Sequence, residues 1–163
     1  VTDSWQFYWD DLPGEKHLRY VPNAGHSLEG TYQLENLASF YYRFLNNINQ
    51  PNWNWKINND TIFVNINQGQ NYKIAKWEVN NSKERDFRIY KIGKTWQKTE
   101  IETNDQGYYA IPVSSNEGYT AALVEVVFDY ESDNPLILST GTLVTPNKYP
   151  FEKYQPEKNL GTK

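Results

Sequence analysis

The chain has 163 residues, of which 38% are hydrophobic and 16% aromatic, so it can bury a substantial core. Its net charge of −4 and pI of about 5.2 exclude the basic footprint of a nucleic-acid-binding domain. The absence of cysteine excludes disulfides and thiol chemistry, and no apolar run reaches the roughly 20 residues of a membrane helix.

The first 50 residues contain two helical patterns with a short strand between them. A short helix is predicted over residues 2–14, with Thr2 or Asp3 as its N-cap. Its apolar face is formed by Trp5, Tyr8, Trp9 and Leu12. Residues 17–21 read as a short strand ended by Pro22. Residues 31–48 are the clearest helix, and their apolar stripe comprises Leu34, Leu37, Ala38, Tyr41, Tyr42, Leu45 and Ile48.

From Trp53 onward the hydrophobic period changes from 3.6 to 2, and turn-forming residues separate the segments. The predicted strands cover residues 53–57, 61–66, 72–79, 86–92, 96–103, 108–113, 119–130 and 136–144. This spacing predicts a mainly β fold, an immunoglobulin- or fibronectin III-like sandwich of about 100 residues.

Two architectures therefore meet near Pro51. Residues 1–50 are interpreted as the end of an α/β domain, residues 51–148 as the β-sandwich, and residues 149–163 as a polar tail. The N-terminal part either packs on the sandwich or belongs to a parallel sheet upstream, and its strand–loop–helix order favours the second. The chain has no methionine, begins at Val1 and shows no leader pattern, so we expect it to be the C-terminal piece of a longer protein.

His26 is the candidate catalytic residue. It lies in a glycine-containing loop between the predicted strand and the long predicted helix, and α/β enzymes place reacting groups at the carboxyl ends of strands. In α/β-hydrolases the triad order is Ser, Asp or Glu, then His, so a histidine in this loop would act as the general base. An ordinary surface histidine is the alternative interpretation.

Other candidates for chemistry are weaker. Residues 25–29 resemble a G-x-S-x-G elbow centred on Ser27, but the fifth residue is Glu29 and no histidine follows. Ser27 is therefore read as a loop residue, and His17 as an exposed side chain. No metal-ligand spacing is present, and no metal or cofactor is predicted. A solvated acidic helix end is formed by Asp10, Asp11 and Glu15.

Two stretches of the chain resemble the PhoPQ-activated pathogenicity-related protein family, whose members are predicted α/β-hydrolases. The first stretch carries Asp3-Ser4, Phe7-Tyr8, Leu12-Pro13-Gly14-Glu15-Lys16, Leu18-Arg19-Tyr20-Val21-Pro22-Asn23 and His26-Ser27-Leu28. The second stretch carries Ala75, Trp77, Asn80 and Arg85-Asp86-Phe87-Arg88. The resemblance is dense over the first 30 residues, looser to about residue 90, and thin beyond.

This resemblance implies that His26 is the triad histidine of a secreted or periplasmic serine hydrolase. The nucleophile and the acid would lie upstream of Val1, with Asp3 as a weaker substitute for the acid. The chain would then carry one triad member and no oxyanion hole, so we expect no hydrolase activity from the chain alone. Its implied partner is the remainder of the parent hydrolase domain.

A different function is also compatible with the sequence. Exposed aromatic residues on a sandwich face could stack on a carbohydrate or contact a protein partner, although core or inter-domain packing explains such residues more often. A plainer reading treats the sandwich as a stabilising lid on the hydrolase domain. The candidate aromatic residues are Trp53, Trp55, Trp77, Trp96, Tyr108 and Tyr109.

Overall fold

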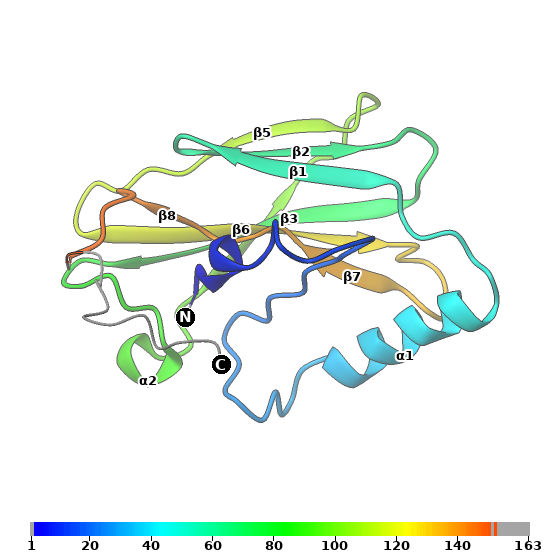
Figure 1. Cartoon of the computed structure of the whole chain (residues 1–163), viewed down its shortest axis with the longest axis horizontal. Helices are drawn as coiled ribbons and strands as arrows, with labels where there is room; N and C mark the ends of the chain where they lie inside the picture. Colours follow the sequence, from blue (N-terminus) through cyan, green and yellow to red (C-terminus); the bar gives the residue numbers. More distant parts are fainter. Residues whose placement is uncertain (1, 151, 153–163) are drawn as a thin grey trace, which may run out of the picture.

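The computed structural model describes residues 2–150 and 152, and two antiparallel β-sheets form most of it (Figure 1). One sheet has the strand order β1-β2-β5, and the other has the order β4-β3-β6-β7 with β8 also paired to β6. The predicted mainly β class is therefore confirmed. The strands are β1 (Trp53–Asn58), β2 (Thr61–Ile66), β3 (Tyr72–Asn81), β4 (Gln97–Ile101), β5 (Tyr108–Pro112), β6 (Tyr119–Phe128), β7 (Leu136–Ser139) and β8 (Leu143–Thr145).

The core lies between the two sheets. Alternate residues of β2 are fully buried, as expected for a strand with one face on a core. The inward residues of both sheets form one continuous cluster, to which β2 contributes Ile62, Val64 and Ile66 and β6 contributes Ala122, Val124, Val126 and Phe128.

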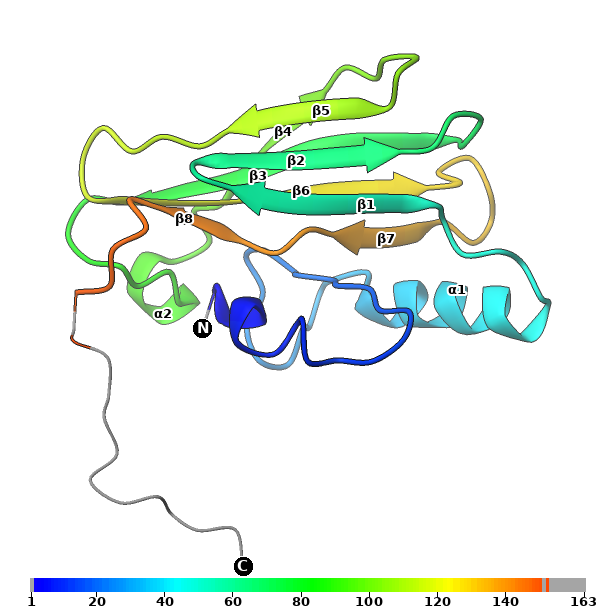
Figure 2. The same cartoon turned by 45° about the horizontal axis from the view of Figure 1, so that its top comes forward.

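The outer face of the five-stranded sheet is also covered. Nearly every residue of β6 is buried, which explains its long apolar run. Part of the cover is a second cluster in which Phe87 packs on Ala121 and Val144. Figure 2 shows η1 (Ser4–Phe7), α1 (Gln33–Leu45) and α2 (Ile89–Ile92) on this side of the molecule.

The predicted strand over residues 136–144 is interrupted by Thr140, Gly141 and Thr142. Here the Trp5 ring lies so close to the backbone that a Cβ atom at Gly141 would be 2.3 Å from Cε2 of the indole. The indole Nε1 of Trp5 also donates to the carbonyl of Thr142 at 2.9 Å. Packing of the N-terminal segment on this edge therefore divides one strand into β7 and β8.

Two local predictions in the first 21 residues are corrected. The predicted helix over residues 2–14 is a single 3₁₀ turn, η1, and Asp3 does not cap it because its carboxylate pairs with Arg85. The predicted strand over residues 17–21 has only one β-bridge, between Leu18 and Ser139. In both places contacts with the sandwich replace the local pattern.

The predicted strand over residues 86–92 is wrong. Its first residues form a turn, in which the Asp86 carboxylate accepts a hydrogen bond from the backbone N–H of Arg88 at 3.2 Å. The next four residues form α2, which ends at Gly93 with φ of 68°. Side-chain hydrogen bonding to the local backbone competes here with strand pairing.

The long predicted helix is confirmed as α1, over Gln33–Leu45. Its apolar stripe, however, faces outward, and the residues that it buries are Asn36, Ser39 and Arg43. The predicted polar tail lies outside the described residues apart from residues 149, 150 and 152.

Candidate active site around His26

The segment that leads to His26 is held on the edge of the five-stranded sheet. The backbone N–H of Ser139 donates to the carbonyl of Leu18 at 2.8 Å, and the N–H of Tyr20 donates to Oγ of Ser139 at 2.8 Å. Ser139 is fully buried, so these bonds are shielded from water. The first part of the chain therefore packs on the sandwich, whatever else it contacts.

A buried ionic network adds to this attachment. Nη1 of Arg19 donates to Oε2 of Glu125 at 2.8 Å, and Nζ of Lys98 donates to Oε1 of the same carboxylate at 2.9 Å. Burial by itself raises the pKa of Glu125, but the Lys98 hydrogen bond and the positive charges of Arg19 and Lys98 outweigh it and lower that pKa. Glu125 is thus an ionised anchor for the segment.

Asn23 forms the turn from this segment into the His26 loop. It has a φ of 59°, in the left-handed region that asparagine tolerates better than most residues. Its side chain makes two hydrogen bonds to the backbone of Trp96, donating to the carbonyl at 2.9 Å and accepting from the N–H at 3.0 Å. The loop is therefore clamped to the connection between α2 and β4.

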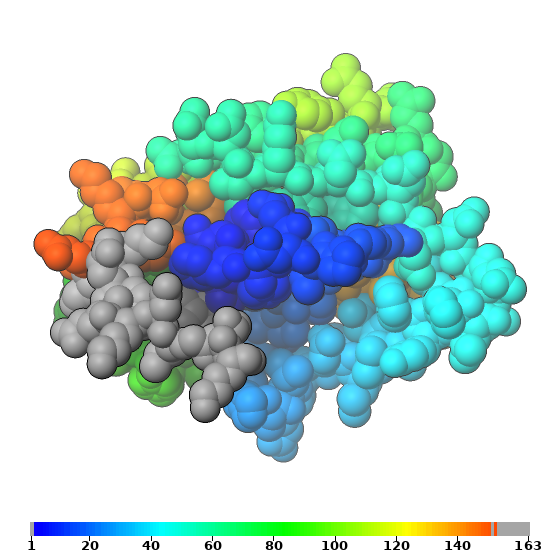
Figure 3. Space-filling model, viewed as in Figure 1, coloured from blue at the N-terminus to red at the C-terminus, as the bar shows by residue number. Residues whose placement is uncertain are grey.

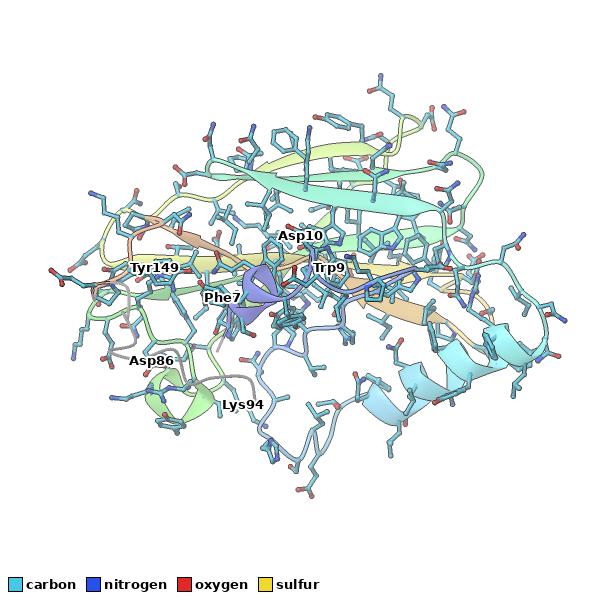
Figure 4. The ribbon with its side chains drawn as sticks, viewed as in Figure 1. Phe7, Trp9, Asp10, Asp86, Lys94 and Tyr149 are labelled. Atoms are coloured by element: carbon cyan, nitrogen blue, oxygen red, sulfur yellow. The ribbon has the colours of Figure 1, made fainter. Side chains whose placement is uncertain are left out.

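A cavity of about 530 Å³ lies beside the loop. One wall runs from Tyr20 to His26, and the other includes Phe87 and Arg88. The two stretches that carry the family resemblance thus meet in space although they are about 60 residues apart in the sequence. In Figure 4, Asp86 and Lys94 lie at the two ends of α2, while Phe7 and Trp9 mark the N-terminal segment.

Arg88 supplies a positive charge on this cavity. Its Nε lies 2.8 Å and 3.0 Å from the two carboxylate oxygens of Asp86, and its guanidinium lies 4.7 Å from the centre of the Tyr90 ring. The hydrogen bond from Arg88 lowers the pKa of Asp86, so this carboxylate stays ionised and paired. Asp86 is therefore not free to orient a histidine.

His26 itself is exposed on the loop. Within residues 2–150 no hydrogen bond or ion pair joins its ring to a carboxylate. Asp3, the substitute considered for the triad acid, is buried and bonded to Arg85 at 2.6 Å. Ser27 accepts a weak hydrogen bond from the N–H of Glu29 at 3.4 Å, as a loop residue does.

His17 and the acidic cluster fall outside this cavity. His17 was expected to be exposed, but its side chain is 15% exposed, pairs with Glu15 at 3.1 Å and lies edge-on to Phe40. Glu15 is exposed, and so are the other two members of the acidic cluster, Asp10 and Asp11. Among the described residues no cluster of His, Cys, Asp and Glu could hold a metal ion.

The aromatic residues considered for ligand stacking do not form an exposed platform. Trp55 lies between Trp5, at 5.0 Å in an edge contact, and Trp9, at 5.6 Å. Of the six candidates in the described structure, only Tyr108 is exposed. Trp53, Trp55 and Tyr109 pack in the core between the sheets, and Trp96 packs on the outer cluster. Trp55 also contacts the N-terminal segment, which is blue in Figure 3.

The contacts that build this site were not apparent from the sequence. Asn23 and Trp96 are 73 residues apart, and Arg19 and Glu125 are 106 residues apart. One available signal was the placement of Arg19, Asn23 and the 85–88 run among the residues that resemble the family. A second was the single acidic residue, Glu125, within the apolar run of β6.

Comparisons with known proteins support the resemblance. Residues 1–88 match the sequence profile of the PhoPQ-activated pathogenicity-related protein family. Autocrine proliferation repressor protein A of Dictyostelium discoideum is 30% identical over 180 aligned positions, which cover 93% of this chain and 36% of that protein. The chain thus spans about a third of the length of that relative. No solved structure matches the chain. The described part contains no helix that is long and apolar enough to span a membrane.

Proposed function

Because the chain belongs to the PhoPQ-activated pathogenicity-related protein family, we propose that it is the C-terminal part of a secreted or periplasmic serine hydrolase. His26 is the general base of the triad in this proposal. The observation that carries it is the position of an exposed histidine on a loop whose preceding segment is held by buried hydrogen bonds and ion pairs. A catalytic base needs such a fixed support and an accessible ring.

In the proposed mechanism, the His26 imidazole takes the proton from the serine hydroxyl as the serine attacks the ester or amide carbonyl. It then returns that proton to the leaving group. The serine and the triad acid lie in the part of the parent protein that precedes residue 1. This chain supplies the base, and through Asn23 and Arg19 it fixes the position of the loop on the sandwich.

The proposal also assigns roles to the segments. Residues 1–50 contribute the segment before the histidine loop, the loop itself and the last helix to an α/β-hydrolase domain. Residues 51–148 form an immunoglobulin- or fibronectin III-like accessory module that supports the loop, and residues 149–163 are a tail. A cavity wall contributed by α2 would make the accessory module part of the substrate site.

The test compares the only two histidines of the chain. In the parent protein, His26→Ala should lower kcat for a simple ester roughly 10⁶-fold, because triad members act as a unit. His17→Ala is the matched control and should leave kcat unchanged, since His17 lies outside the cavity. The 163-residue chain alone should not exceed an imidazole control.

Three results would contradict the proposal. The first is ester turnover by the chain alone that is lost in His26→Ala. The second is full activity of the parent protein after His26→Ala. The third is equal loss in both histidine variants without a change in melting temperature, because this would deny His26 a specific role.

A further inference from the structure

Helix α1 is attached to the sandwich through its polar side. Arg43 is buried, with Nη1 bonded to Asp129 at 2.6 Å and Nη2 donating to the carbonyl of Asn49 at 2.6 Å. Asn36 is also buried, and its Oδ1 accepts a hydrogen bond from the backbone N–H of Ile137 at 2.6 Å. These contacts fix which side of the helix faces inward.

The opposite side of α1 is apolar and exposed. Residues 36, 39 and 43 lie on the buried side, whereas the apolar residues recur at the spacing that places them on the other side. We call this surface the α1 apolar face. It comprises Leu34 (78% exposed), Leu37 (47%), Tyr41 (54%), Tyr42 (45%), Phe44 (69%) and Leu45 (74%).

The area of the α1 apolar face is that of a protein interface. Six large side chains at these exposures leave on the order of 700 Å² uncovered, taking roughly 200 Å² for each. The largest apolar patch of a typical monomer is about 300–600 Å². A stable interface buries about 800 Å² on each partner. An amphipathic helix ordinarily turns such a stripe toward a core.

The charges of α1 limit what can cover this face. The helix has only two charged residues, Glu35 and Arg43, and Arg43 is already paired inside the protein. A helix that lies on a lipid surface carries several lysine and arginine residues on its polar side, whereas α1 has only Arg43, which is buried and paired with Asp129. A face without charge resembles a permanent interface rather than a transient one.

We propose that the α1 apolar face is the docking surface for the part of the parent polypeptide that precedes residue 1, through an apolar sheet face. About two-thirds of the Dictyostelium relative lies outside the region matched by this chain, enough for a separate sheet. The face also begins only eight residues after His26, so the domain that docks there lies next to the proposed base. The inference rests on the part of the proposed function that gives the parent protein an upstream hydrolase domain. It does not depend on the catalytic role of His26.

The test uses two tyrosines of similar exposure, Tyr41 (54%) on the face and Tyr108 (50%) on β5. In the 163-residue chain, Tyr41→Lys and Tyr108→Lys should each change the melting temperature by less than about 2 °C, as exposed substitutions do. In the parent protein, Tyr41→Lys should lower it by more than about 5 °C, because the lysine charge is buried at the contact. Tyr108→Lys should remain neutral there.

A second measurement does not depend on a folded variant. Carbene footprinting of the wild-type parent protein should label Tyr41 and Phe44 several-fold less than footprinting of the 163-residue chain. The labelling of Tyr108 should be the same in both. Equal labelling of α1 in the two proteins, or equal melting shifts for the two lysine variants, would overturn the proposal.

Other occupants give different results. A second copy would make the 163-residue chain a dimer by light scattering, and Tyr41→Lys would dissociate it. A lipid surface would make the chain sediment with phosphatidylcholine–phosphatidylglycerol vesicles, and Tyr41→Lys would abolish this. Either result, or an open reading frame that starts at residue 1, overturns the proposal. If the proposed hydrolase function were wrong but the docking proposal right, His26→Ala would keep full activity and the effects of Tyr41→Lys would remain.

Discussion

Glu125 offers a direct test of how the sandwich holds the segment before His26. Its side chain is 6% exposed and accepts hydrogen bonds from Arg19, which is 14% exposed, and Lys98, which is 39% exposed. Glu125→Gln keeps the shape of the side chain and removes its charge. The buried guanidinium of Arg19 would then lack an anionic partner.

The magnitude follows from the burial of the two partners. Removing one member of a buried ion pair costs about 3–5 kcal/mol, because the other charge stays desolvated. Lys98 is exposed enough to regain water, and the glutamine oxygen still accepts one hydrogen bond from Arg19. The expected loss in the free energy of unfolding is therefore about 3 kcal/mol. For a chain of this size that is a fall of about 6–12 °C in melting temperature.

Urea unfolding followed by tryptophan fluorescence measures this change at pH 7. Glu78→Gln is the control, because Glu78 is 39% exposed and its ion pair with Lys76 lies on the surface, worth less than about 0.5 kcal/mol. Hydrogen exchange at the Tyr20 amide should also become faster in Glu125→Gln, since that amide is bonded beside the network. Equal losses in the two glutamine variants, or a Glu125→Gln loss below about 0.5 kcal/mol, would refute the reasoning.

The same carboxylate gives a pH dependence with a defined sign. The pKa of Glu125 in the folded protein lies below its ordinary value of 4.5. The unfolded state therefore binds the proton more readily, and the stabilisation is fully present above pH 4.5 and lost as the pH falls through the folded pKa. The difference in stability between wild type and Glu125→Gln should be constant above that pH and shrink below it.

Two further substitutions test the contacts of the N-terminal segment. Gly141→Ala should destabilise the protein by about 1–3 kcal/mol and shift the emission of Trp5, because its Cβ would meet the indole at 2.3 Å. Gly25→Ala is the control and should be neutral, because no atom lies within 4 Å of the new Cβ. Equal unfolding midpoints for Gly141→Ala and Gly25→Ala would contradict the close packing of Trp5 on Gly141. Asn23→Ala should cost about 1–3 kcal/mol and speed hydrogen exchange at the Trp96 amide, whereas unchanged exchange there would argue against the clamp.

The strands could be predicted because their burial alternates with the period of the backbone. In β2 the apolar residues Ile62, Val64 and Ile66 face the core, and the residues between them do not. The sequence also predicts β6, although both of its faces are buried, because a mainly apolar segment bounded by turns and rich in β-branched residues favours a buried strand.

The failures have a common cause in long-range contacts. The local pattern of residues 2–14 favours a helix, but Asp3 bonds to Arg85 and Trp5 to Thr142, so the chain turns instead. The stripe of α1 predicted the helix correctly but not its orientation, because Arg43 finds its partner 86 residues away in Asp129. Periodicity identifies the two sides of a helix and does not state which side a neighbour will contact.

The candidate site combines residues from both sides of the composition change near Pro51. Residues before it supply His26, and residues after it supply the contacts that hold the His26 loop, including the Trp96 backbone and the Glu125 carboxylate. If the sandwich were removed, Arg19 would lose its anionic partner and the Leu18 carbonyl would lose the N–H of Ser139. If the first segment were removed, Glu125 would be left as an acidic residue on a largely apolar face. The sandwich therefore holds the segment that leads to the histidine loop, and the charge of Glu125 on β6 serves that attachment rather than the core.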